Sequence, residues 1–165
     1  MLKSKLNGKN KIQAVNTWAV AILRYGAGII DWKGDDLKQL DRSTRKTLTM
    51  YGAFHPRSDV DRLYVKRREG GRGLISVEAC VKLEENNLGL YVHESNEMLL
   101  KGVKNVKVIE TEHTVEKAVF ERRQQNDYKN RWQENRMYGQ YVRGMTDDVD
   151  KALSWNWVAC SDLKI

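Results

Sequence analysis

The 165-residue chain has one proline, two cysteines and no long apolar run. Cys80 and Cys160 lie far apart and neither has a C-x-x-C partner, so the sequence predicts neither a disulfide framework nor a zinc site. Two isolated cysteines fit a reducing compartment, and we expect an intracellular protein, nuclear or cytoplasmic. No apolar run approaches the ~18 residues of a membrane span, and no cleavable signal follows the basic N-terminus, so no membrane partner is expected.

The familiar catalytic patterns are missing as well. No Ser-His-Asp or Cys-His grouping and no PD-(D/E)xK arrangement is readable, and the glycine-rich segment at 70–73 is not a P-loop because no G-K-[ST] follows. The acid pairs Asp35-Asp36 and Asp147-Asp148 each precede a helical pattern, where carboxylates offset the helix dipole. The sequence therefore predicts no catalytic residue, no metal and no cofactor, and we do not expect an enzyme.

Positive charge is concentrated in the first half of the chain. Residues 1–75 hold 16 Lys and Arg against 7 Asp and Glu, whereas residues 76–165 hold 13 against 15. Clustered cations that neutralise phosphates supply most nonspecific affinity for nucleic acid. The distribution favours RNA or DNA as a partner, with an ordinary solvated basic surface as the alternative.

The basic residues gather in two neighbouring stretches. On a helix expected over 36–50, three cations share a face, because they are three to four residues apart. The irregular stretch after the only proline, Pro56, adds six more around a glycine-rich turn. The predicted nucleic-acid contacts are Arg42, Arg45, Lys46, His55, Arg57, Arg62, Lys66, Arg67, Arg68 and Arg72. For His55, stabilising its own loop is an equally open role.

Apolar spacing predicts a mainly α-helical fold with one short β-hairpin. Helical spacing runs through 9–30 and 36–50, and Ser76 is a suitable N-cap for a helix that continues toward Leu100. Residues 62–66 favour a strand, and Gly70-Gly71 supply the positive-φ positions of a turn. The expected hairpin therefore covers about 62–74 and carries much of the basic cluster.

A helical extension is expected after a polar segment at 101–112. A long helix from about 114 to 142, ended by Gly144, carries a thin apolar stripe of Val115, Ala118, Val119, Tyr128, Trp132 and Met137. Thr146 is placed to cap a short last helix. Its Trp155 and Trp157 are expected in the core, because large aromatic side chains bury much apolar area.

Several segments match a longer pattern in register. Residues 55–78 contain H-P-R-x-D-V-D-R-L-Y followed by E-G-G-R-G-L-I-S-V-E. Upstream stand N-K-I-x-A-x-N-x-W-A-x-x-x-x-R-Y-x-A-G-I-I and D-R-x-T-R-K-x-x-T-M-x-G-A-x-H-P-R, and SWNWVACSDLKI near the end is similar to S-W-x-W-L-x-x-x-D-L-K. Together they resemble the polyproteins of non-LTR retrotransposons, just downstream of the reverse-transcriptase palm. The likeness covers most of 5–95 and returns near 154–164; copies often have Pro where Lys66 stands, and 101–144 matches loosely.

The resemblance implies the thumb and post-thumb linker of a reverse transcriptase, an RNA-directed DNA polymerase. The family's thumb grips the template–primer duplex, and its palm holds two Mg²⁺ ions on a Y/F-x-D-D motif. Neither that motif nor the family's C-x-x-C…H…C zinc knuckle is in this sequence. The resemblance thus implies a fragment without polymerase activity, with a thumb-like domain over 1–100 and a linker and helical extension over 101–165. The missing palm and knuckle parts would be its partners.

Two other functions stay open beside this one. The chain would be a stand-alone nucleic-acid-binding module derived from such an element, or a protein-interaction scaffold with an incidental basic patch. A decayed copy without function is also compatible with the sequence. A free-standing module should bury the apolar stripe of the 114–142 helix, whereas a broken-off piece should expose it.

Overall fold

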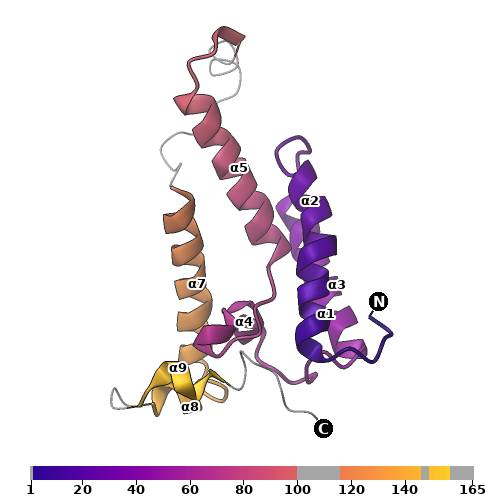
Figure 1. Ribbon diagram of the computed structural model, residues 1–165, viewed down its shortest axis with the longest axis vertical. Coiled ribbons are helices and arrows are strands. Elements are labelled where there is room, and N and C mark those ends of the chain that lie inside the picture. The colour runs from indigo at the N-terminus through magenta and orange to yellow at the C-terminus, as the bar shows by residue number, and fades with distance from the viewer. Residues whose placement is uncertain (1, 100–115, 146–148, 157–165) are drawn as a thin grey trace.

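A computed structural model of the chain describes residues 2–99, 116–145 and 149–156, which form helices joined by loops (Figure 1). In chain order the elements are α1 Gly8–Ala14, the π-helical segment η1 Val15–Val20, α2 Ala21–Gly26, α3 Gly34–Met50, α4 Val60–Tyr64, the 3-10 turn η2 Arg67–Glu69, α5 Val77–Glu94, α7 Lys117–Glu134, α8 Gln140–Arg143 and α9 Lys151–Ser154. The prediction of a mainly α-helical fold is confirmed. Within the described ranges, no helix has the length and apolar character needed to cross a membrane.

The helices of the first half begin where local sequence signals place them. Helices α1, η1 and α2 run on from one another over residues 8–26, within the span expected from apolar spacing. Asp35 and Asp36 lie in the first turn of α3, as predicted. The Ser76 side chain accepts a hydrogen bond from the Ala79 backbone N–H and caps α5, also as predicted.

The segment predicted as a β-hairpin is built differently. Residues 62–64 are the end of α4 and 67–69 a 3-10 turn, and no strand occurs in the part of the chain that the structure describes. The β-propensity of Leu63 to Val65 is overridden because Asp59 caps the preceding turn, its side chain accepting from the Arg62 N–H. The predicted strand over 62–66 is therefore absent.

The chain nevertheless reverses at the predicted glycines. Gly70 has a φ of 87°, and a Cβ on Gly71 would collide with the Val65 carbonyl oxygen. The returning backbone lies directly against the outgoing one, and its N–H groups donate to earlier carbonyls: Arg72 to Arg62, Gly73 to Val65, and Leu74 to Leu63. The loop therefore reverses direction as a hairpin does, but its backbone hydrogen bonds do not form the regular pattern of paired β-strands.

The core consists of three apolar clusters, two of which contain a residue at the end of α4. The largest joins α1, η1, α3 and α5 through Ile12, Val15, Val20, Leu48, Ala53, Tyr64, Leu74 and Cys80. A second contains Ala27, Leu37, Val77 and Val81. The third, under the reversed loop, is Val65, Trp132 and Trp155. Burial of Trp155 confirms its predicted core role.

Helix α7 buries only part of its predicted stripe. It ends at Glu134 rather than near 142, and Gly144 follows the short helix α8 instead. Tyr128 and Trp132 pack into the core, whereas Met137 is 72% exposed and Val119 is 37% exposed. Ala118 is exposed too. Some of the predictions concern residues outside the described ranges: Val115, the 101–112 segment, Thr146, Asp147-Asp148, Trp157 and Cys160.

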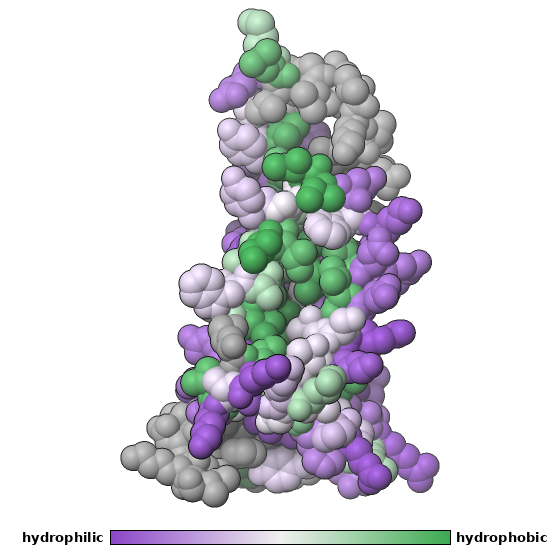
Figure 2. Space-filling view, turned by 90° about the vertical axis from the view of Figure 1, so that its right-hand side faces the viewer, coloured by the Kyte–Doolittle hydropathy of each residue, from purple (hydrophilic) through white to green (hydrophobic). Residues whose placement is uncertain are grey.

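One side of the η1–α2 stretch leaves large apolar side chains in contact with solvent. Trp18, Ile22, Tyr25 and Ile29, here called the apolar face, are 68%, 75%, 88% and 84% exposed. Figure 2 shows a vertical band of hydrophobic residues along this side of the molecule. An apolar surface of this kind marks an interaction site more often than a free surface.

Candidate nucleic-acid interface

The predicted basic residues are divided between the two sides of α4. Successive residues of a helix are about 100° apart, so Val60, Asp61 and Tyr64 face one way while Arg62 and Leu63 face the other. Each side of α4 lines a separate cavity. Six of the ten predicted contacts are therefore split between two separate cavities and do not form one continuous patch.

The first cavity, here called the mixed cavity, lies between α3, α4, α5 and α7 and has a volume of about 330 Å³. Its charged lining is Lys38, Asp41, Arg42, Arg45, Asp61, Glu78 and Arg131. Three carboxylates thus stand among four cations. Arg131 Nε lies 2.9 Å from Asp61 Oδ1, and Arg45 Nη1 donates to the Tyr64 hydroxyl at 2.6 Å.

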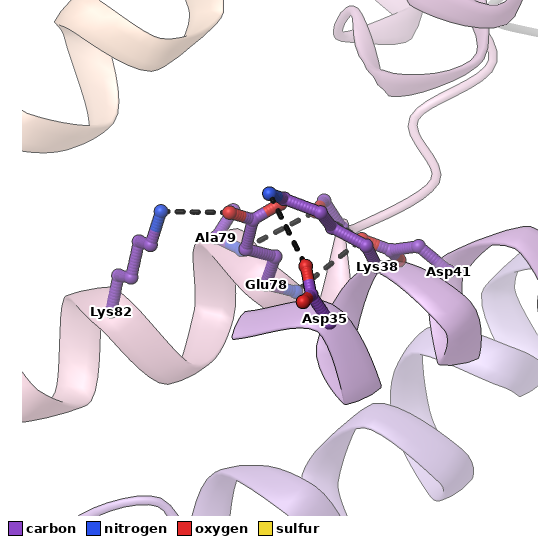
Figure 3. Close-up of polar contacts among 7 residues, drawn as sticks. Asp35, Lys38, Asp41, Glu78, Ala79 and Lys82 are labelled. Carbon is purple, nitrogen blue, oxygen red and sulfur yellow. Dashed lines mark hydrogen bonds and ion pairs between the residues drawn. The ribbon is translucent and has the colours of Figure 1, made fainter. Parts of the chain in front are cut away.

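Asp41 forms the floor of the mixed cavity. It is 6% exposed, and its carboxylate accepts from the Ser76 hydroxyl at 2.6 Å and from the Val77 and Glu78 N–H groups at 2.8 and 3.3 Å. Figure 3 shows Asp41 on α3 beside the first turn of α5, with the Lys38–Asp35 and Lys82–Glu78 ion pairs nearby. This carboxylate joins α3 to α5 and forms no ion pair with a cation of the described residues.

The second cavity, here called the cationic pocket, lies on the other side of α4 and has a volume of about 220 Å³. It is lined by His55, Arg57, Ser58, Asp59, Arg62, Leu63, Arg72 and Tyr138. Four of the ten predicted contacts are brought together here. Its one carboxylate is already engaged, because Asp59 Oδ1 accepts from the Arg62 N–H at 2.9 Å and Oδ2 from the Asn135 amide at 3.0 Å.

Arg62 is held rigidly at the base of the cationic pocket. Its Nε donates to the Gly70 carbonyl at 3.0 Å, and its guanidinium lies 5.2 Å from the Trp132 ring and 6.0 Å from that of Trp155. Burial, and secondly the charge of Arg72, lowers the pKa of Arg62. Burial and Arg72 lower the pKa of Arg67 as well. Arg72 is thus close enough to repel both Arg62 and Arg67.

The remaining predicted contacts lie outside both cavities. Lys46 and Arg68 are exposed on the surface, and Lys66 lines a third cavity of about 310 Å³ among α2, α5 and α7. Within the described ranges, the side chains of Lys46, Lys66 and Arg68 form no ion pair. They are available to a ligand but are not arranged with the others.

The four acidic residues between positions 41 and 72 all have hydrogen-bond or ion-pair partners. Between 41 and 72 the only carboxylates are Asp41, Asp59, Asp61 and Glu69. Asp61 pairs with Arg131, and Glu69 with Lys129 at 3.3 Å, both from α7. The cations of residues 42–72 are consequently left without these neighbours as salt-bridge partners.

Sequence reasoning missed the α7 side of this region. Arg131, Lys129 and Tyr138 reach residues about 60 to 80 positions earlier in the chain. No local spacing joins residues so far apart, and the family-like pattern is loose here. Only the charges gave a signal for these contacts. Lys129 and Arg131 lie two residues apart on α7, and they match in sign the two carboxylates, Glu69 and Asp61, with which they pair.

The comparisons with known proteins return no relative. No family model matches the chain, and no curated protein or solved structure is similar to it. The described residues contain no group of three or more His, Cys, Asp or Glu side chains placed to hold a metal ion.

Proposed function

We propose that this chain is the thumb and post-thumb linker part of a non-LTR retrotransposon reverse transcriptase and that it binds template–primer nucleic acid through phosphates. In this proposal the reversed loop over 62–74 takes the place of the basic hairpin expected from the sequence. RNA and DNA are the partners, together with the palm and zinc-knuckle parts of the same polyprotein. The chain itself carries no catalytic residue.

One observation carries the proposal: six of the cations between residues 42 and 72 have no carboxylate partner among the described residues. Arg42, Lys46, Arg57, Lys66, Arg68 and Arg72 form no ion pair with a described residue, while all four carboxylates of this stretch are bound elsewhere. A protein surface that serves only solubility mixes both signs. Unneutralised clustered Lys and Arg residues are what counterion release from nucleic acid requires.

A salt series tests the proposal. Binding of the chain to a labelled RNA–DNA hybrid should weaken linearly in log–log form, and an Arg42→Ala/Lys46→Ala/Arg68→Ala variant, whose three residues lie outside the cationic pocket, should reduce the slope by up to ~2.7, or 0.9 per lost phosphate contact. The matched control is Lys117→Ala/Arg122→Ala/Arg123→Ala on the exposed part of α7, which removes the same net charge and should leave the slope nearly unchanged. If both variants lose the same amount of slope, the salt dependence reflects the net charge of the chain, and a dedicated interface is refuted.

The absence of polymerase activity is tested separately. In a primer-extension assay with Mg²⁺ and all four deoxynucleotides, the purified chain should leave the primer unextended. Incorporation above a no-protein control would contradict the proposed fragment.

The apolar face favours a second candidate, a protein-interaction scaffold. The η1–α2 stretch is apolar both toward the core and toward solvent, and helices of that kind are normally covered. In a scaffold, an Ile22→Asp/Tyr25→Asp variant should lose self-association, measured by light scattering, at any salt concentration. Salt-insensitive association without any affinity for the hybrid would favour this second function over the first.

A further inference from the structure

We propose that the cationic pocket binds a terminal phosphate group of a nucleic-acid strand, distinct from the backbone phosphates that the rest of the basic surface contacts. The nature of the strand rests on the proposed function. The pocket itself stands on its own geometry, so the two ideas fail separately.

The lining of the pocket consists almost entirely of groups that donate to an anion. Arg57 and Arg72 have side chains with no hydrogen bond or ion pair to a described residue, and Arg62 uses Nε for the Gly70 carbonyl, leaving its two Nη groups. Ser58 and Tyr138 add two hydroxyls. Guanidinium groups bind phosphate oxygens through paired, charge-assisted N–H bonds.

His55 is oriented to add a further donor. Its Nδ1 accepts a hydrogen bond from the Arg57 backbone N–H at 3.1 Å. In the neutral ring the proton then sits on Nε2, which becomes a donor. The same bond turns the loop 55–57 so that the ring and the following arginine line the same pocket.

The one acidic residue of the pocket does not compete with an incoming anion. Both oxygens of Asp59 are taken, by the first turn of α4 and by Asn135. Its charge attracts Arg62 and so offsets part of the repulsion that Arg62 receives from Arg72. Three arginines against one carboxylate still leave a net positive site.

Size and charge select the kind of phosphate. About 220 Å³ lies below the ~300–1,000 Å³ of pockets that enclose drug-sized ligands, so the cavity suits a group and not a whole nucleotide. A phosphate monoester carries about −1.5 to −2 charge at pH 7 and three free oxygens. A backbone diester has one charge and two free oxygens. A pocket with three guanidiniums therefore favours the end of a strand.

The rigidity of Arg62 supports the same conclusion. Stacking on Trp132 and Trp155 and the bond to Gly70 fix its guanidinium before any ligand arrives. Holding it near Arg72 costs free energy that an anion between them would return. Preorganised donors lose little entropy on binding, which is typical of a ligand site.

The test compares hybrids of one sequence that differ only at the strand end. Hybrids with a 5′- or 3′-phosphate and with hydroxyl ends are titrated against the chain, and binding of inorganic phosphate is followed separately by ³¹P NMR. We expect one phosphorylated end to bind about tenfold more tightly than the hydroxyl end, equal to ~1.4 kcal/mol. Arg57→Ala/Arg72→Ala should abolish both the preference and the phosphate signal. The charge-matched Lys117→Ala/Arg122→Ala should keep both.

Each outcome decides one of the two ideas. Equal binding of phosphorylated and hydroxyl ends, with steep salt dependence intact, overturns the pocket and leaves the proposed function standing. Binding of inorganic phosphate without any binding of hybrid supports the pocket and overturns nucleic acid as its source. Arg72→Lys serves as a second variant, because it keeps the charge and the fold but removes the paired donors; it should retain only part of the preference. Full retention would overturn bidentate recognition.

Discussion

The two cavities beside α4 are made from the same kinds of residue and differ in how many carboxylates line them. In the mixed cavity there are three: Asp61 pairs with Arg131 of α7, Glu78 pairs with Lys82, and Asp41 accepts from the first turn of α5. In the cationic pocket the single carboxylate, Asp59, is turned into the fold. The charge of each site is therefore set by how many acidic residues line it, because the numbers of basic residues are similar.

Removing the support of the cationic pocket should have the largest effect. Trp132 is 2% exposed and packs against Val65, Trp155 and the guanidinium of Arg62. Trp132→Ala should lower the free energy of unfolding by about 3–5 kcal/mol, as for other large-to-small core changes. Urea denaturation measures it, with the exposed Met137→Ala as control. A loss below 1 kcal/mol would mean that α7 contributes little to the fold.

The floor of the mixed cavity should come next. Asp41→Ala leaves the Ser76 hydroxyl and the Val77 N–H buried without their acceptor, so we expect a loss of about 2–3 kcal/mol. Asp127→Ala, on the exposed part of α7, should change stability by less than about 0.5 kcal/mol. Similar small losses from both would show that Asp41 is not structural.

Alkaline pH should affect the mixed cavity through its tyrosine. Burial, and secondly the charge of Asp41, raises the pKa of Tyr64 from 10.0 to about 12. The folded protein thus keeps a proton that the unfolded chain loses. The stability from this group is full below pH 10 and is lost as pH rises through about 12, a fall of about 2–3 kcal/mol. Denaturation between pH 9 and 12 should show a shallower fall for Tyr64→Phe, and identical profiles would contradict the prediction.

The smallest effect should come from making the mixed cavity resemble its neighbour. Asp61→Asn releases Arg131 and removes one of three carboxylates. Affinity for the RNA–DNA hybrid should rise about two- to threefold at low salt, because an exposed ion pair contributes only about 0.2–1 kcal/mol. Asp127→Asn removes the same charge elsewhere. If both variants gain equally, the mixed cavity takes no part in binding.

Local signals in the sequence account for much of the fold. The Ser76 cap, the acidic first turn of α3 and the apolar spacing of 9–30 each depend on neighbours within a few residues, and each is present as expected. The strand over 62–66 was mispredicted because propensity was weighed without the Asp59 cap. The break after Glu134 is not predicted by the sequence pattern, because α7 ends at its C-cap Asn135 without a glycine or proline, and Gly139 comes only at the start of α8.

The site was predictable in composition and not in arrangement. The sequence places His55, Arg57, Arg62 and Arg72 within 18 positions, and the structure brings them together. What separates them from Arg42 and Arg45 is the 100° step between Asp61 and Arg62 on α4. The neutralising partners come from α7, far along the chain, where only the folded structure defines which charges remain.

The π-helical segment fixes the rotational phase of the first helix. A turn with i→i+5 bonds holds one residue more than an α-turn. Asn16, in this segment, donates its amide to the Gly73 carbonyl at 2.7 Å and accepts from the Ile75 N–H at 3.0 Å, so it locks the base of the basic loop. Deleting a single residue between 17 and 20 would turn α2 by about 100° relative to Asn16. The apolar face would then rotate away from its present direction while the loop stayed in place. One residue of the π-helical segment thus sets the angle between the apolar face and the basic loop.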